Sequence, residues 1–167
     1  MNVAVVVGNP KANSRTLRVA IAVADALSVR LGIDGNRLVV DLAEVATELF
    51  DPEASRVNDL LNDVAASNLI IVASPTFKAT YTGLLKAFFD RYRTNALSAA
   101  VAVGVMTGAA PIHTLAVEVH LRPLLVELGA SVPTRGLYVT EQQFDDLDAA
   151  IGGWADGASP RLAQALT

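Results

Sequence analysis

The sequence has 167 residues, of which 52% are hydrophobic, and its 17 Asp and Glu against 13 Lys and Arg give a formal net charge of −4. This length and composition are typical of one globular domain, and because no long basic run is present, nucleic acid is not expected as a partner. The chain contains no cysteine, which excludes disulfides, thiolate metal sites and cysteine nucleophiles.

The N-terminal segment predicts a buried strand, a polar loop and a helix. Val3 to Val7 is a short apolar run without alternation, which is typical of a strand buried on both faces. Gly8 and Pro10 end this strand. From Arg15 to Leu31 the apolar residues recur at three- and four-residue spacing, which predicts an amphipathic helix.

The loop before this helix has the composition of an anion site. The N–H groups at a helix start attract negative charge. Ser14 and Thr16 add hydroxyl groups, and Lys11 and Arg15 add positive charge. We therefore expect this loop to hold a phosphate, although an ordinary helix cap would use the same residue types.

Further apolar runs predict four more strands, at Arg37 to Leu42, Asn68 to Ala73, Ala99 to Met106 and Arg135 to Val139. The first of these alternates in polarity, which suits an edge strand. Helical spacing predicts one helix ending near Ala65 and another after Gly83.

A long helix is predicted from Ile112 to Leu128. Pro123 falls inside it and lacks an N–H, so we expect a kink or break there. Gly129 is a suitable residue to end it. In the tail, two interruptions at Gly152-Gly153 and Ser159-Pro160 favour only a short helix, Pro160 to Leu166.

Five strands alternating with helices predict an α/β fold, a parallel sheet with helices on both faces. The chain is short and its first loop is not Gly-x-Gly-x-x-Gly, which favours a flavodoxin-like three-layer sandwich with strand order 2-1-3-4-5 over a Rossmann order. In that order ligands bind outside the carboxyl ends of the strands. Residues 1–167 are expected to form one such domain.

Three loops follow strands at this edge and together suit one ligand. The first, Asn9 to Thr16, is suited to a phosphate. The second, Ser74 to Thr82, offers Pro75 and the ring of Phe77 to a flat heteroaromatic group. The small residues of Thr107 to Ala110 let backbone amides approach the edge of that ring and stabilise negative charge there, as a reduced flavin requires.

The motifs in these loops resemble the NADPH-dependent FMN reductases of flavodoxin-like fold. The matching segments are Gly8-Asn9-Pro10-Lys11 with Ser14-Arg15-Thr16, the run from Ser74-Pro75-Thr76-Phe77 to Thr82-Gly83-Leu84-Leu85-Lys86, and Thr107-Gly108 with His113 and the stretch from Leu115 to Leu125. Within that family the chain is most similar to reductases that supply reduced flavin to two-component monooxygenases. The resemblance spans residues 1 to about 140.

The resemblance implies FMN and NAD(P)H as cofactors and assigns roles to residues. Asn9, Lys11, Ser14, Arg15 and Thr16 would hold the FMN phosphate. Pro75, Thr76, Phe77 and Lys78 would contact the isoalloxazine, and Thr107, Gly108 and Ala109 would lie beside its pyrimidine end. No residue is assigned a catalytic role, and no metal site is expected.

Other functions fit the same fold. A flavodoxin-type electron carrier is usually more acidic and more aromatic than this chain, in which Phe, Trp and Tyr make up 5%. A reductase that holds FMN tightly and acts on quinones, azo compounds or chromate is a second alternative. A flavodoxin-like domain that has lost its flavin is a third.

Several side chains allow two interpretations. His113 and His120 could be proton donors or ligands, but helix-surface or interface positions are favoured. Tyr81 could stack on a nicotinamide or pack under its loop. The helix from Ile112 to Leu128 has more apolar residues than one buried face needs, and with the family resemblance this predicts a homodimer or homotetramer.

No charged segment precedes an apolar stretch at the N-terminus, and no apolar run reaches ~18 residues. We therefore expect no signal peptide, no membrane span and a cytoplasmic protein. Its expected partners are FMN, a nicotinamide cofactor and, from the resemblance, a flavin-dependent monooxygenase.

Overall fold

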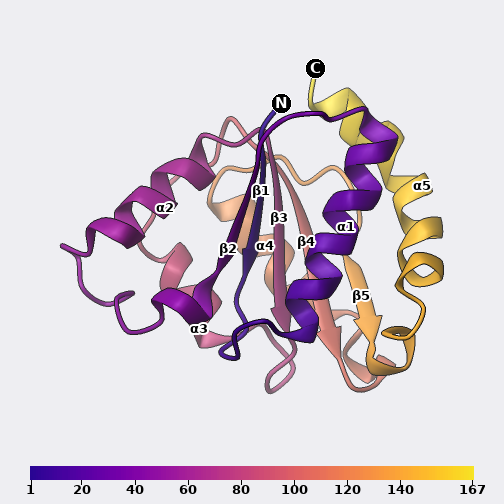
Figure 1. The fold of residues 1–167 in the computed structure, drawn as a ribbon, viewed down its shortest axis with the longest axis horizontal. Coiled ribbons are helices and arrows are strands. Elements are labelled where there is room, and N and C mark those ends of the chain that lie inside the picture. The colour runs from indigo at the N-terminus through magenta and orange to yellow at the C-terminus, as the bar shows by residue number, and fades with distance from the viewer.

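The computed structural model describes residues 1–167 as a five-stranded parallel sheet between two layers of helices (Figure 1). The strands are β1 (Val3–Val7), β2 (Arg37–Asp41), β3 (Leu69–Pro75), β4 (Val101–Gly108) and β5 (Leu137–Thr140). Their order is β2-β1-β3-β4-β5, and every neighbouring pair is parallel. This confirms the flavodoxin-like fold and the edge position of β2.

Alternate residues of the strands pack into two separate cores. Val3, Val5 and Val7 of β1 face the layer formed by α1 (Arg15–Leu31) and α5 (Leu147–Ala165). Ala4 and Val6 face the opposite layer. That layer contains α2 (Ser55–Ala65), α3 (Gly83–Phe89) and α4 (Arg122–Glu127). Because both faces are covered, the central strands are apolar throughout, as the sequence pattern predicts.

Helix α1 begins and ends at the predicted residues. The Ser14 side chain caps its start by accepting a hydrogen bond from the Leu17 N–H, at 3.2 Å. Gly32 ends it in a left-handed conformation, with φ of 63°. The helix therefore starts directly beyond the loop that follows β1, at the carboxyl edge of the sheet (Figure 1).

The predicted helix from Ile112 to Leu128 is three short segments rather than one. They are a 3₁₀ turn η2 (Pro111–His113), a π-helical turn η3 (Val117–Leu121) and α4. The Arg122 N–H donates to the Val117 carbonyl, five residues back, just before Pro123. The proline cannot continue the ordinary ladder, which explains the break. Gly129, with φ of 89°, follows the end of α4 as predicted.

The prediction of only a short C-terminal helix is wrong, because α5 runs without interruption from Leu147 to Ala165. Its buried residues, Ile151, Ala155, Ala158 and Leu162, recur at helical spacing and belong to the core that α1 lines. Pro160 lies on the exposed side. Tertiary packing therefore outweighs the low helix propensity of Gly152, Gly153 and Pro160.

The remaining short elements are 3₁₀ turns, η1 (Leu42–Val45) after β2 and η4 (Glu141–Gln143) after β5. Strand β4 extends two residues further than predicted, so that Thr107 and Gly108 belong to the strand rather than to a loop. None of the helices combines the length and apolar character needed to cross a membrane. No group of three or more His, Cys, Asp or Glu side chains is arranged to hold a metal ion.

Candidate active site

A cleft of about 390 Å³ lies where the loops after β1, β3 and β4 meet the segment after β5. Every predicted site residue except Lys78 lines this cleft. The structure adds three residues to the predicted set, so that the lining comprises Asn9, Lys11, Asn13, Ser14, Arg15, Thr16, Pro75, Thr76, Phe77, Thr107, Gly108, Ala109, Glu141 and Phe144. The predicted loops therefore converge on one site.

One end of the cleft is formed by the start of α1. The backbone N–H groups of Arg15 and Thr16 make no hydrogen bond within the chain. Both belong to the first turn of a helix, where such groups carry partial positive charge. Lys11 has no ion-pair partner. This end of the cleft therefore offers free donors and positive charge to an anion.

Hydrogen bonds between side chains join this first loop to β4. The Asn9 amide donates to Thr16 Oγ1 at 3.2 Å, and Thr16 Oγ1 lies 2.9 Å from Thr107 Oγ1. Thr16 is 2% exposed and Thr107 is 3% exposed. The predicted hydroxyl of Thr16 is thus already engaged within the protein, and its main effect is to hold two walls of the cleft together.

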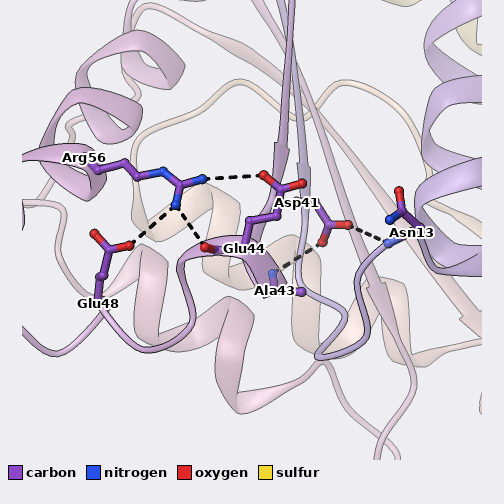
Figure 2. A network of polar contacts seen from close by, with 6 residues as sticks. All are labelled: Asn13, Asp41, Ala43, Glu44, Glu48 and Arg56. Atoms are coloured by element: carbon purple, nitrogen blue, oxygen red, sulfur yellow. Dashed lines mark hydrogen bonds and ion pairs between the residues drawn. The ribbon is translucent and has the colours of Figure 1, made fainter.

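Asp41, at the end of β2, fixes the conformation of the same loop (Figure 2). Its carboxylate accepts hydrogen bonds from the Asn13 N–H at 3.0 Å and the Ala43 N–H at 3.3 Å. Asn13 has φ of 54°, a left-handed conformation that is uncommon outside glycine. Figure 2 also shows Arg56 with Glu44 and Glu48, a separate network that does not contact Asp41. Asp41 therefore positions the loop without lining the cleft.

The second loop is tied to the first through Thr82. The Thr82 hydroxyl donates to the Gly8 carbonyl at 2.5 Å and accepts from the Leu85 N–H at 3.1 Å, which caps α3. The Thr82 N–H donates to Ser74 Oγ at 3.0 Å. A Cβ on Gly8 would come within 2.4 Å of Leu85 Cβ, so glycine is required for this close approach.

A tight turn at the tip of the second loop presents an aromatic ring to the cleft. Phe77 and Thr80 exchange backbone hydrogen bonds of 2.8 and 3.2 Å across Lys78 and Ala79. These two residues have φ of 51° and 69°, which costs side-chain-bearing residues energy. Phe77 remains 51% exposed and lines the cleft, whereas Lys78 does not line it.

The third wall is formed by the last residues of β4. The Thr76 N–H donates to the Thr107 carbonyl at 2.7 Å, and the N–H groups of Ala109 and Ala110 are free of hydrogen bonds. Tyr138 of β5 packs directly behind Gly108: a Cβ there would lie 2.0 Å from the phenol oxygen. A side chain at residue 108 would therefore have to displace the phenol end of Tyr138.

The sequence interpretation missed Glu141 and Phe144, which close the cleft opposite α1. Arg15 Nη2 donates to Glu141 Oε1 at 2.6 Å, and the Arg15 guanidinium carbon lies 4.9 Å from the centre of the Phe144 ring. Both residues directly follow β5, and Asp41 likewise ends β2. The rule that ligands bind at the carboxyl ends of parallel strands would have been sufficient to identify all three.

The other residues considered from the sequence lie outside the cleft. His113 and His120 are exposed on separate turns. Tyr81 packs against the core on the α3 side rather than facing the cleft. The two groups with clearly raised pKa values are also elsewhere: the hydrogen bond that Lys86 donates to the Asp90 carboxylate raises the pKa of Lys86, and burial raises the pKa of Tyr92.

The charges of the cleft are confined to one end. Lys11, Arg15 and Glu141 are its only charged residues, and the walls contributed by β3 and β4 carry none. The arrangement can bind an anion at the start of α1 and a flat ring between Pro75, Phe77 and the end of β4. It contains no cysteine, histidine or metal cluster that could carry a reaction by itself.

Comparison with known proteins identifies relatives that are all named as FMN reductases. A family model described as NADPH-dependent FMN reductase matches residues 1–145. An FMN reductase (NADPH) of Pseudomonas aeruginosa is 32% identical over 138 residues, which cover 80% of this chain and 73% of that protein. The NADH-dependent FMN reductase SfnF of Pseudomonas putida is 31% identical over 151 residues, covering 87% of this chain and 80% of that protein.

A solved structure with a similar fold has a related activity. The apo form of an NADH:FMN oxidoreductase, EMOB, superposes with a TM-score of 0.84 and 26% identity. The superposition covers 99% of this chain and 90% of that one. It includes the segment beyond residue 145, which the family model does not match.

Proposed function

The chain belongs to the NADPH-dependent FMN reductase family, and from this premise we propose that FMN binds in the cleft at the carboxyl ends of the strands. As a member, the protein is an oxidoreductase that uses FMN and NAD(P)H. FMN bound there would supply the redox chemistry, hydride transfer with the nicotinamide. The protein binds the two molecules and orients them.

The observation that carries this proposal is the set of free donors at the start of α1. The N–H groups of Arg15 and Thr16 are unpaired, the Ser14 hydroxyl can still donate its hydrogen, and Lys11 carries an unpaired charge. A phosphate accepts hydrogen bonds of this kind on three oxygens. We place the FMN phosphate here, with Asn9 and Thr16 holding the loop in position.

The opposite end of the cleft fits the flavin ring. Pro75, Thr76 and Phe77 form one wall, and Thr107, Gly108 and Ala109 form the other. The cleft volume of about 390 Å³ lies within the range of roughly 300–1,000 Å³ common for small-molecule sites. The free N–H groups of Ala109 and Ala110 are available to stabilise negative charge at the ring edge. Lys78 is proposed to contact the ring only if its turn moves toward the cleft.

The proposed mechanism needs no acid or base from the protein in the hydride step. The walls around the ring carry no titratable side chain. Their role is to hold the flavin with one face accessible to the nicotinamide, at contact distance. Turnover should therefore depend on the shape of the walls and on their backbone amides.

The finer proposal is that reduced FMN leaves the protein for a partner monooxygenase. It is supported by the resemblance of the loop motifs to reductases with that role. The cleft is also open, since the Arg15 side chain is 59% exposed. A tightly retained FMN that passes electrons to quinones, azo compounds or chromate is the alternative.

Anaerobic titration tests both the proposed reduction of FMN in the cleft and the proposed release of reduced FMN. FMN is added to the purified protein, followed by NADPH or NADH, and the flavin absorbance is recorded. We expect saturable FMN binding and loss of the oxidised flavin spectrum with one or both nucleotides. Ultrafiltration should then recover reduced flavin in the filtrate. Retention of the flavin by the protein would support the alternative, and no reduction with either nucleotide would contradict the reductase assignment.

We further propose that a second copy of the chain covers the outer face of η2, η3 and α4. Four large apolar side chains are exposed there: Ile112 at 82%, Leu115 at 71%, Val119 at 56% and Val126 at 54%. Contiguous exposed apolar side chains are typical of interaction surfaces. Light scattering at micromolar concentration should report a dimer or tetramer, and a mass near 17.5 kDa would contradict this proposal.

We propose that residues 1–167 form a single FMN-binding domain that functions in the cytoplasm. The segment beyond residue 145 forms α5, whose buried residues share a core with α1. It therefore packs as part of the same unit. The cytoplasm is proposed because it holds the NAD(P)H pool that the reaction consumes.

A further inference from the structure

Arg15 is engaged on two sides in the free protein. Its Nη2 donates to Glu141 Oε1 at 2.6 Å, and Phe144 lies under its guanidinium group at 4.9 Å. Both partners belong to the segment after β5. Glu141 lies 126 residues from Arg15 in the sequence. All three residues line the cleft. The ion pair thus spans the end of the cleft where the phosphate is proposed to bind.

Glu141 is the only acidic residue among those that line the cleft. Lys11 and Arg15 are the only basic ones, so the lining has a formal charge of +1 rather than +2. A phosphate monoester carries a charge of roughly −1.5 to −2 at pH 7. A bound phosphate would have to compete with the Glu141 carboxylate for Arg15.

The backbone around Glu141 is held independently of this ion pair. Gln143 Oε1 accepts hydrogen bonds from the Thr140 N–H at 2.8 Å and from the Thr140 hydroxyl at 3.0 Å. The Arg15 and Glu141 side chains are 59% and 45% exposed, and ion pairs of such exposure contribute little to folding. The turn that carries Glu141 is therefore held by the local fold, and the ion pair is not required to maintain that turn.

From this geometry we infer that Glu141 weakens the binding of the FMN phosphate by keeping Arg15 in the ion pair, so that flavin exchanges readily instead of being retained. The inference rests on the proposed binding of FMN in this cleft. A ligand that binds only when Arg15 is released has its affinity reduced by the fraction of molecules in the released state. Glu141 is a positioning residue that acts through Arg15, and it matches the proposed role of FMN as a substrate that leaves.

Substitution Glu141→Gln tests the inference because it removes the charge and keeps the shape. Phe144 still supports the guanidinium group, and the hydrogen bonds of Gln143 are unaffected. We expect the dissociation constant for FMN to fall about three- to fivefold, with a matching decrease in the dissociation rate, since most affinity changes lie in that rate. The dissociation constant for riboflavin, which lacks the phosphate, should change less than about twofold.

Two further variants test whether the change in FMN affinity depends on Arg15 or only on the loss of a negative charge. Glu53→Gln is the matched control, because Glu53 is exposed, has no ion pair and lies outside the cleft. It should leave both flavin affinities unchanged. In an Arg15→Gln background, Glu141→Gln should tighten FMN binding less than about twofold, because the residue through which it acts is gone.

The results for these variants distinguish a failure of the inference about Glu141 from a failure of the proposed FMN site. If Glu141→Gln leaves FMN affinity unchanged or weakens it, the inference is overturned, since Glu141 would then orient Arg15 toward the phosphate. A full gain that persists in the Arg15→Gln background would also overturn it. If the unmodified protein binds FMN and riboflavin equally, the proposed phosphate site itself is wrong. Flavin fluorescence titration and stopped-flow exchange provide both measurements.

Discussion

At one end of the cleft hydrogen bonds fix the loop from Asn9 to Thr16, whereas at the other end close packing shapes the walls around Gly108. Asp41 holds Asn13 at the first end, and the Asn9 amide bonds Thr16. At the second end a Cβ on Gly108 would contact the Tyr138 hydroxyl, and the turn at Lys78 and Ala79 is held in a left-handed conformation. The first end thus depends on polar groups and the second on shape.

This difference predicts which substitutions discriminate between flavins. FMN and riboflavin share the ring and differ in the phosphate. Loss of donors or of loop support at the polar end should weaken FMN binding and spare riboflavin binding, and changes at the packed end should affect both equally.

The largest expected effect is that of Gly108→Val at the packed end. Its Cβ would lie 2.0 Å from Tyr138 Oη, so either the Tyr138 side chain or the end of β4 must move beside the proposed ring site. We expect both flavins to bind at least about tenfold more weakly and kcat/KM to fall about 100-fold or more, since small misplacements near the reacting atoms cost this much. Stopped-flow reduction at saturating FMN measures the effect on the chemical step.

A second variant tests whether this contact is the cause. Gly108→Ala should be impaired for the same reason, and adding Tyr138→Phe should restore part of the activity by removing the oxygen atom. Full impairment of the double variant would show that the wall tolerates no side chain at residue 108 even without the hydroxyl.

A smaller effect is expected from Asp41→Ala at the polar end. Loss of the carboxylate frees the N–H groups of Asn13 and Ala43, so the loop must be ordered when the ligand binds. FMN affinity should fall roughly three- to tenfold and the free energy of unfolding by about 1–2 kcal/mol, with riboflavin affinity nearly unchanged. Glu44→Gln is the control, because Glu44 pairs only with Arg56 (Figure 2). Equal losses of affinity for FMN and riboflavin would contradict the assignment of the phosphate to the polar end.

Ala79→Gly should have a modest stabilising effect. Ala79 has φ of 69°, which glycine adopts without strain. We expect the free energy of unfolding to rise by about 0.5–1 kcal/mol and Tm by about 2 °C. Ala66→Gly, at a residue with φ of −80°, should instead lower Tm slightly. A lower Tm for Ala79→Gly would show that the turn is not strained.

The smallest effects are expected for His113→Ala and His120→Ala. Both side chains are exposed and neither lines the cleft. Each substitution should change kcat/KM less than about tenfold, which corresponds to under ~1.4 kcal/mol. A thousandfold loss with FMN still bound would identify a proton donor outside the described cleft.

The fold was predictable where local signals and packing agree. Helix α1 has a capping Ser14, an apolar stripe and Gly32 at its end, and all three indicate the same boundaries. In α5 they disagree: Gly152, Gly153 and Pro160 indicate breaks, whereas Ile151, Ala155 and Leu162 are spaced to pack toward α1. Packing between α1 and α5, which are far apart in the sequence, is not contained in local propensity, so the long helix was missed.

The candidate site was predictable to the extent that it follows β1, β3 and β4. Those loops carry motifs of small and hydroxyl residues, and all of their predicted residues except Lys78 line the cleft. Asp41, Glu141 and Phe144 carry no motif. They contribute because the carboxyl ends of all five parallel strands lie on the same side of the sheet, so that their place after β2 and β5, and not a motif, identifies them.

The most direct test of the account is the flavin preference of a Ser14→Ala, Arg15→Ala double variant. It removes the hydroxyl and the guanidinium group from the proposed phosphate end and leaves the packed end unchanged. We predict that FMN binds at least about tenfold more weakly, at ~1.5–3 kcal/mol per charged hydrogen bond, and that riboflavin binds as before. Equal weakening of both flavins would contradict the placement of the phosphate at the start of α1.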